Sequence, residues 1–241
     1  MVKPTPTKSR TPFYGLLALI VAAGAVGIYY AMNSAPKPIV LDEKAIATLP
    51  KAEGYLRGNP NAPVTIIEFG DFECPACGNF ATVSEPDIRA RIIETGAANF
   101  RFYDYPLPMH QNTLSAHLAA SCANAQGKFW EMHDELFAAQ DQWNTQATSN
   151  PRKVIDKLAQ KIGLAVPVYD KCMADQNMSQ ILANRKAGEE RGVSSTPTVF
   201  IGTTQINTAS SVDKLKAIVD SLAKLAPVAV APATETAKAK K

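Results

Sequence analysis

The chain has 241 residues, of which 46% are hydrophobic and 20% are charged, a globular composition that excludes collagen-like and low-complexity classes. Its formal net charge of +3 comes from Lys3, Lys8 and Arg10, because the rest of the chain holds 22 basic against 22 acidic residues. A neutral remainder lacks the basic face that displaces counterions from nucleic acids, so we expect no nucleic-acid partner.

An uncharged stretch from Phe13 to Met32 follows these basic residues. A helix of about 20 residues, rising about 1.5 Å per residue, spans the roughly 30 Å hydrocarbon core of a bilayer. All the preceding charge is positive, and the positive-inside tendency therefore places residues 1–12 in the cytoplasm. The alternative is a cleaved signal peptide, but its apolar region is shorter and no good cleavage site follows Met32. We predict a transmembrane anchor over residues 13–32, and under either alternative the later residues lie outside the cytoplasm.

Two further segments lack the pattern of a folded element. Residues 33–50 contain several prolines among scattered charges, and we interpret them as a linker. Residues 227–241 consist mostly of Ala, Pro, Thr and Lys without periodicity, and we expect them to be disordered. The intervening residues 51–226 have the length of a single domain.

That domain opens with the pattern of a parallel α/β unit. Residues 64–69 have the β-branched enrichment of a buried strand, and residues 99–103 alternate like a second strand. Helical spacing then dominates about residues 108–190, before extended sequence returns at residues 198–202. A final amphipathic helix follows around residues 212–222. The sequence therefore predicts an α/β fold with an inserted α-helical subdomain.

Two cysteines, Cys74 and Cys77, stand at the start of the helix that follows the first strand. Unpaired N–H groups and the positive end of the helix dipole favour a thiolate at Cys74. Pro75 suits the first helical position because it has no N–H to leave unpaired. The spacing brings the two sulfurs within bonding distance, with Cys77 one turn further in. We interpret Cys74 as a nucleophile and Cys77 as its resolving thiol.

The same pair would also suit a permanent disulfide or half of a zinc site. A zinc site needs further ligands, and no paired spacing supplies them among Cys122, Cys172, His110, His117 and His133. We therefore expect no metal and no other cofactor. We expect the three histidines to lie at the surface or in satisfied polar contacts.

Three motifs carry a resemblance to a known family. Residues 62–77, reading APVTIIEFGDFECPAC, resemble the active-site strand of the DsbA-like branch of the thioredoxin superfamily, most closely its membrane-anchored members. Residues 127–130 (GKFW) and 192–198 (GVSSTPT) match the same branch in the same order. The resemblance covers about residues 52–225 and implies a thioredoxin-like fold.

The resemblance also implies roles for residues outside the redox pair. Pro197 matches a cis-proline whose loop packs beside the pair and binds substrate peptide, and Thr196 before it tunes reactivity and substrate handling. Glu68 matches a buried acid that helps move protons at the resolving cysteine. Cys122 and Cys172 should point into the helical subdomain, either as buried thiols or, as in some family members, as a structural disulfide. We favour the disulfide, because thiols that meet in an oxidising compartment are oxidised.

One departure from the family concerns the dipeptide between the cysteines, which is Pro75-Ala76 here and Pro-His in the best-known strongly oxidising members. An imidazole that would stabilise the Cys74 thiolate is missing. We therefore expect a less depressed pKa at Cys74 and a less oxidising pair.

The sequence thus predicts a membrane-tethered, extracytoplasmic thiol–disulfide oxidoreductase, a monomer that introduces disulfides into reduced or unfolded exported proteins. A substrate thiolate attacks the Cys74–Cys77 disulfide, a mixed disulfide forms on Cys74, and a second substrate thiol resolves it. The resemblance implies reoxidation by a membrane redox partner of DsbB or vitamin K epoxide reductase type. Two alternatives stay open: a reductase or isomerase kept reduced by a membrane electron donor, and a non-catalytic chaperone that holds peptides near Pro197.

Overall fold

The structure, a computed structural model, describes residues 11–33 and 48–225, which fall in two separate compact units. The C-terminal tail predicted at residues 227–241 lies outside the described residues. So do residues 1–10 of the predicted cytoplasmic segment and residues 34–47 of the predicted linker.

The first unit contributes one described helix, α1 (Thr11–Asn33), which covers the uncharged stretch of the sequence. Large apolar side chains along it are exposed, among them Leu19 and Val21. Within the described part of the chain, no helix combines the length and the hydropathy needed to cross a membrane. The transmembrane anchor predicted over residues 13–32 is therefore not confirmed.

The second unit is built on a mixed sheet of five strands in the order β1-β3-β2-β4-β5. The central strands β2 (Val64–Gly70) and β3 (Ala98–Asp104) run parallel, as expected for strands joined by a helical crossover. β4 (Thr198–Ile201) runs antiparallel to β2 and pairs with β5 (Thr204–Ile206). β1 (Tyr55–Arg57) runs antiparallel to β3 at the other edge. The predicted α/β fold is confirmed, and β1 is an additional strand that the sequence did not predict.

A continuous helical path in which α-helical and π-helical stretches alternate carries the two cysteines and joins β2 to β3. Pro86 lies in the first turn of α4, where its missing N–H leaves few hydrogen bonds unmade. The π-helical stretches on either side widen the turn. The path consists of α3 (Pro75–Asn79), η1 (Phe80–Ser84), α4 (Glu85–Ile88) and η2 (Arg89–Ile93).

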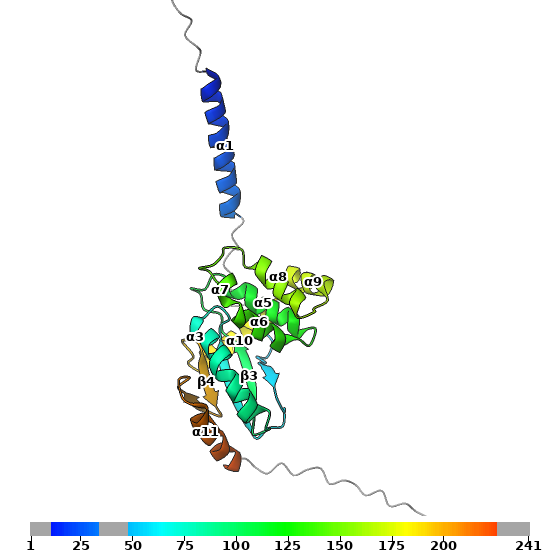
Figure 1. Ribbon diagram of the computed structural model, residues 1–241, viewed down its shortest axis with the longest axis vertical. Helices are drawn as coiled ribbons and strands as arrows, with labels where there is room; N and C mark the ends of the chain where they lie inside the picture. Colours follow the sequence, from blue (N-terminus) through cyan, green and yellow to red (C-terminus); the bar gives the residue numbers. More distant parts are fainter. Residues whose placement is uncertain (1–10, 34–47, 226–241) are drawn as a thin grey trace, which may run out of the picture. The chain divides into compact units, whose positions relative to one another are not determined.

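The predicted helical insertion separates β3 from β4 and packs at one end of the sheet, while α11 (Val212–Leu225) lies towards the other (Figure 1). Phe72 lies between the sheet and the insertion, with its ring centroid 5.1 Å from Phe102 of β3 and 5.0 Å from Phe137 of α6. The insertion therefore shares its core with the strand that leads into the cysteines. It comprises α5 (Thr113–Asn124), α6 (Phe129–Ala138), α7 (Gln140–Trp143), α8 (Arg152–Lys161), α9 (Val166–Asp175) and α10 (Ser179–Glu190).

A disulfide between Cys122 of α5 and Cys172 of α9 holds two of these helices together. Cys122 is buried, and Cys172 is partly buried against the same core. The expected structural disulfide is therefore present, inside the helical insertion as expected.

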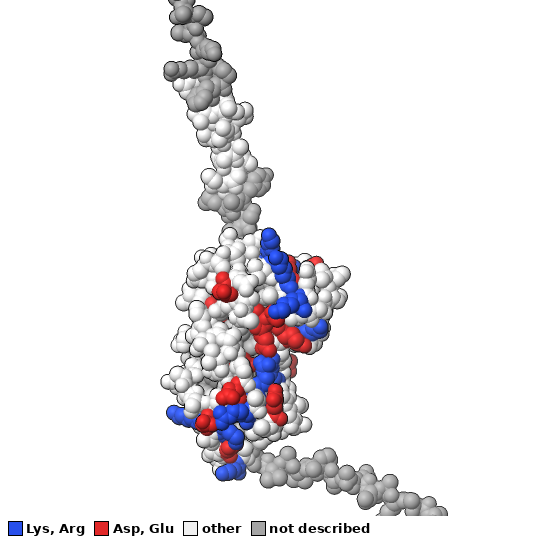
Figure 2. Space-filling view, viewed as in Figure 1, with Lys and Arg blue, Asp and Glu red and all other residues white. Residues whose placement is uncertain are grey.

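Charged side chains of both signs lie side by side on the surface of the folded unit. Figure 2 shows Lys and Arg beside Asp and Glu along one side and at the lower end of the face in view, while much of the remaining face carries neither. Several of these charges form pairs one helical turn apart, including Lys171–Asp175, Arg185–Glu189 and Lys216–Asp220.

Candidate redox site

Cys74 and Cys77 lie at the start of α3, immediately beyond the carboxyl end of β2. Cys74 is the N-cap residue, with an extended backbone (φ −71°, ψ 122°), and Pro75 occupies the first helical turn. Both cysteines are free thiols in this structure. Cys77 is 0% exposed and Cys74 is 7% exposed, so Cys74 is the one that solvent reaches.

The surroundings push the pKa values of the two thiols apart. A hydrogen bond from the Cys77 thiol has the largest effect on the pKa of Cys74 and lowers it. Burial raises this pKa, whereas contacts with Thr196 and with the N–H groups of Cys77 and Ala76 lower it further. Together they lower the pKa of Cys74 to about 5. Burial, helped by the nearby Cys74 and Glu68, raises the pKa of Cys77 well above its ordinary value. A low pKa at Cys74 is therefore reached without a histidine between the cysteines.

The loop before β4 closes over Cys74. The Thr196–Pro197 peptide bond is cis, as the resemblance implied. The Cys74 thiol donates to the Thr196 carbonyl oxygen at 3.4 Å, across 122 residues of sequence. Because β4 runs antiparallel to β2 and begins opposite its last residues, this loop and the cysteine turn lie at the same end of the sheet.

Glu68 lies on β2, six residues before Cys74, with its side chain fully buried. Neither carboxylate oxygen has a hydrogen-bond partner among the described residues. Burial first, and then the nearby charges of Glu85 and Cys74, raise the pKa of Glu68 well above its ordinary value. Glu68 in turn helps to raise the pKa of Cys77, so this buried carboxyl group is a candidate for exchanging a proton with that thiol.

Asp71, which the sequence analysis did not single out, links the cysteine turn to the insertion. Its backbone N–H donates to Cys77 Sγ at 3.4 Å, and its carbonyl oxygen accepts from the Cys74 N–H at 3.0 Å. Its carboxylate accepts from His110 Nδ1 at 2.7 Å and from the Thr113 hydroxyl. Although burial opposes ionisation, these contacts and the charge of His117 lower the pKa of Asp71.

All three histidines are in polar contacts, the second of the two environments that we expected. His110 pairs with Asp71, and this hydrogen bond raises the pKa of His110. His117 and His133 are fully buried and bond Asp104 at 2.6 Å and Asp134 at 2.9 Å through Nδ1. Their Nε2 atoms have no hydrogen-bond partner among the described residues.

A cluster with the spacing of metal ligands is formed by residues of α4 and α6. Among the described residues, Glu85, His133 and Asp134 bring ligand atoms within 4.8 Å of one another. Arg57 and Arg89 already pair with both carboxylates, at 3.2 to 3.5 Å. These positive charges oppose a cation, and we interpret the cluster as an ion-pair network.

The comparison with family models decides the family. A model described as Thioredoxin matches residues 51–221. This chain belongs to the thioredoxin family. The family predicted from the motifs around Cys74 is thereby confirmed at the level of the superfamily.

Relatives of this thioredoxin-family chain include proteins of very different length. The Na⁺/H⁺ antiporter NhaA 3 of Salinispora tropica is 32% identical over 169 residues, which cover 69% of this chain and 24% of that protein. The chain thus spans about a quarter of the length of the antiporters that it matches. Disulfide bond formation protein D of Bacillus subtilis is 24% identical over 184 residues, which cover 73% of this chain and 80% of that protein.

Solved structures share the fold of this chain. Oxidised BdbD from Bacillus subtilis matches with a TM-score of 0.59 and 21% identity, covering 73% of this chain and 98% of that one. DsbA from Chlamydia trachomatis matches with a TM-score of 0.62 and 21% identity, covering 81% and 100%. The predicted DsbA-like fold, a thioredoxin-like sheet with a helical insertion, is confirmed.

Proposed function

We propose that this protein is a thiol–disulfide oxidoreductase that works as an oxidase, introducing disulfides into reduced exported proteins. One observation carries the proposal: the pKa of Cys74 is lowered to about 5 while that of Cys77 is raised well above its ordinary value. A thiolate favoured at Cys74 stabilises the reduced pair, so the oxidised pair readily takes up electrons. Such a pair is suited to oxidising other thiols.

The reaction begins with the oxidised Cys74–Cys77 pair. A substrate thiolate attacks Cys74 Sγ, the bond to Cys77 breaks, and Cys77 leaves as a thiolate that takes a proton. Glu68 is the buried acid beside this thiol and the group that we assign to the proton transfer. A second substrate thiolate then attacks the substrate sulfur of the mixed disulfide and Cys74 leaves as a thiolate. The substrate gains a disulfide, and its two electrons stay on the cysteine pair.

The loop at Thr196 and Pro197 is proposed to bind the substrate peptide. It lies against Cys74, whose thiol contacts the Thr196 carbonyl oxygen. An extended peptide that delivers its cysteine to Cys74 would pass along this loop, where backbone groups can bind it.

Turnover requires an electron acceptor that reoxidises the pair, and we propose a membrane protein of DsbB or vitamin K epoxide reductase type. The support is in the sequence: an uncharged stretch at residues 13–32 follows a segment whose only charges are basic. Anchored there as a monomer, with its catalytic domain outside the cytoplasm, the protein and its oxidant would share one membrane. Protease digestion of intact spheroplasts tests this location, since only an external domain would be cleaved.

The main alternative is a reductase or isomerase kept reduced by a membrane electron donor. The observation that favours it is the Pro75-Ala76 dipeptide, which lacks an imidazole to stabilise the thiolate. One assay distinguishes the two directions of electron flow. In it, full-length protein in mild detergent is mixed with reduced, unfolded ribonuclease A. We expect the oxidised form to generate disulfides and ribonuclease activity. If only the reduced form acts, by rearranging scrambled ribonuclease, the oxidase proposal is wrong.

A further inference from the structure

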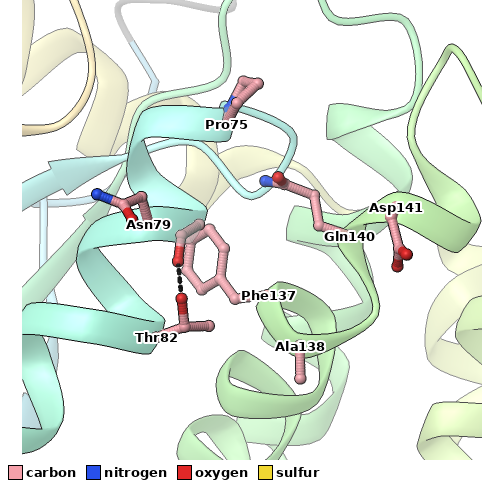
Figure 3. A pocket seen from close by; sticks show the side chains of 8 residues that line it. Pro75, Asn79, Thr82, Phe137, Ala138, Gln140 and Asp141 are labelled. Carbon is pink, nitrogen blue, oxygen red and sulfur yellow. Dashed lines mark hydrogen bonds between the residues drawn. The ribbon is translucent and has the colours of Figure 1, made fainter.

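Gln140, the first residue of α7 in the helical insertion, reaches the turn that carries Cys74. Its side-chain Nε2 donates to the carbonyl oxygen of Phe72 at 2.7 Å and to that of Cys74 at 2.9 Å. Figure 3 shows this side chain extending from α7 towards the turn at Pro75. Both protons of one amide are therefore used on two carbonyls of the turn that leads into α3.

The position of this amide depends on the glycine that follows Cys77. A Cβ atom at Gly78 would lie 2.9 Å from Oε1 of Gln140 and 3.2 Å from its Cδ and Nε2. Gly78 has a helical backbone within α3, so its conformation does not require glycine. The close approach of Gln140 means instead that a Cβ at this position would displace the end of the glutamine side chain. Gly78 also donates its own N–H to the Cys74 carbonyl at 3.0 Å, so helix and insertion bind the same oxygen.

Gln140 also borders an open groove between the cysteine helix and the insertion. The groove has a volume of about 300 Å³ and is lined by Pro75, Gly78, Asn79, Thr82, Phe137 and Gln140, among others (Figure 3). Because the groove separates α3 and η1 from α6 and α7 on this side, the amide of Gln140 bridges the two walls beside the reactive cysteine.

The extended N-cap conformation of Cys74 decides how well its thiolate is stabilised. In this conformation the sulfur lies near the N–H groups of Ala76 and Cys77 at the open end of α3. Rotation of the turn would carry the sulfur away from those donors. The Phe72 and Cys74 carbonyls lie on either side of the peptide units that would rotate, and Gln140 holds both.

We propose that Gln140 is a positioning residue for the redox pair, because it holds the turn in which the Cys74 thiolate meets the N–H groups of α3. The redox potential of the thioredoxin core is then set in part by a residue of the helical insertion. This inference rests on the proposed redox exchange at Cys74–Cys77 but not on the direction of electron flow.

The test compares two glutamine variants of the full-length protein in mild detergent. Gln140→Met keeps the length and helix propensity of the side chain but removes both donors. Gln142→Met makes the same change two residues along α7, at an exposed side chain that makes no hydrogen bond to any described residue. The reduction potential is measured in glutathione buffers by alkylation resolved for each cysteine, and the ionisation of Cys74 by the ultraviolet absorbance of the thiolate against pH.

We expect Gln140→Met to shift the equilibrium of the pair about tenfold towards the disulfide, which is about 30 mV more negative. The pKa of Cys74 should rise with it, while Gln142→Met matches the wild type in both measurements. If Gln140→Met loses thermal stability but keeps the wild-type potential and ionisation, Gln140 is only a structural contact and the inference is wrong. If the wild-type pair itself does not equilibrate with glutathione, the proposed function fails instead.

A second variant tests the same contact from the other side. Gly78→Ala leaves Gln140 in the chain but places a Cβ against its amide. We expect a shift of the same sign, and Gly78→Ala combined with Gln140→Met should shift the potential no further than the larger single change, because both remove one contact. If Gln140→Met does not fold, the Gly78→Ala variant becomes the test of the inference. An unchanged reduction potential in Gly78→Ala would then overturn it.

Discussion

The two cysteine pairs of this chain lie at opposite ends of their helices. Cys74 is the N-cap of α3, where N–H groups and the positive end of the dipole favour a thiolate. Cys122 and Cys172 lie in the last turns of α5 and α9, where the negative end of each dipole disfavours one. The disulfide of the first pair is therefore suited to thiol–disulfide exchange, and that of the second pair is suited to remain intact. The side chains of the two pairs are chemically identical, and their positions along the helices distinguish the redox pair from the structural cross-link.

The largest expected effect comes from removing the nucleophile. Cys74→Ser should abolish disulfide transfer to reduced ribonuclease A, because a hydroxyl group cannot form the mixed disulfide. Cys122→Ala with Cys172→Ala should leave the transfer rate within a few-fold of the wild type. A chaperone that holds peptides without exchange would keep its effect on refolding in Cys74→Ser, and that result would contradict the enzymatic account.

The second pair should matter for stability. Cys122→Ala with Cys172→Ala opens a cross-link between residues 50 apart in sequence, and a loop of that size contributes about 2–4 kcal/mol. The free energy of unfolding, measured by urea denaturation of the oxidised proteins, should fall by that amount. A loss of transfer activity larger than the loss of folded protein would show that this disulfide takes part in exchange, which the comparison of the pairs does not allow.

Glu68→Gln tests how the buried thiol of the first pair exchanges its proton. The amide has almost the same shape but cannot exchange the proton, so the step in which Cys77 leaves or attacks should slow by about tenfold or more. Rapid mixing with a glutathione mixed disulfide on Cys74 measures that step directly. The folded state should be at least as stable as in the wild type, because the Glu68 carboxylate has no hydrogen-bond partner among the described residues. An unchanged rate would remove Glu68 from the mechanism.

The smallest expected effect concerns the Asp71–His110 pair behind the cysteine turn. The pKa of His110 is raised in the folded state, so its contribution to stability is present below about pH 6.5 and is lost as the pH rises through the folded pKa. His110→Gln should therefore cost stability mainly under mildly acidic conditions, by no more than about 1 kcal/mol because solvent screens the partly exposed ring. Urea denaturation at several pH values checks this. A difference that grows with rising pH would contradict the assigned ion pair.

Local sequence was enough to predict the parts of the site that lie close together in the chain. Cys74, Pro75 and Cys77 follow a β-branched strand, and the rules for helix N-termini then identify the nucleophile. The Thr196–Pro197 loop could be assigned to the site only through the family resemblance, because only the pairing of β4 with β2 brings it to Cys74. Helical spacing predicted the insertion but not the way its helices pack.

What the sequence did not predict depends on contacts between distant residues. Asp71 and His110 are 39 residues apart, and Gln140 and Cys74 are 66 apart, so no spacing rule links them. Strand β1 has only three residues, too few for a periodic pattern, and forms because β3 offers it a free edge. Tertiary packing determined each of these features.

The reduction potential of Cys74–Cys77 in the full-length protein tests the central claim most directly. Glutathione buffers set the potential, and alkylation resolved for each cysteine keeps Cys122 and Cys172 separate. With a Cys74 thiolate stabilised at the helix N-terminus, we expect a value closer to about −120 mV, as in DsbA, than to about −270 mV, as in thioredoxin. A value at or below that of thioredoxin would show that the reduced pair is not stabilised, and would contradict the account of this protein as an oxidase.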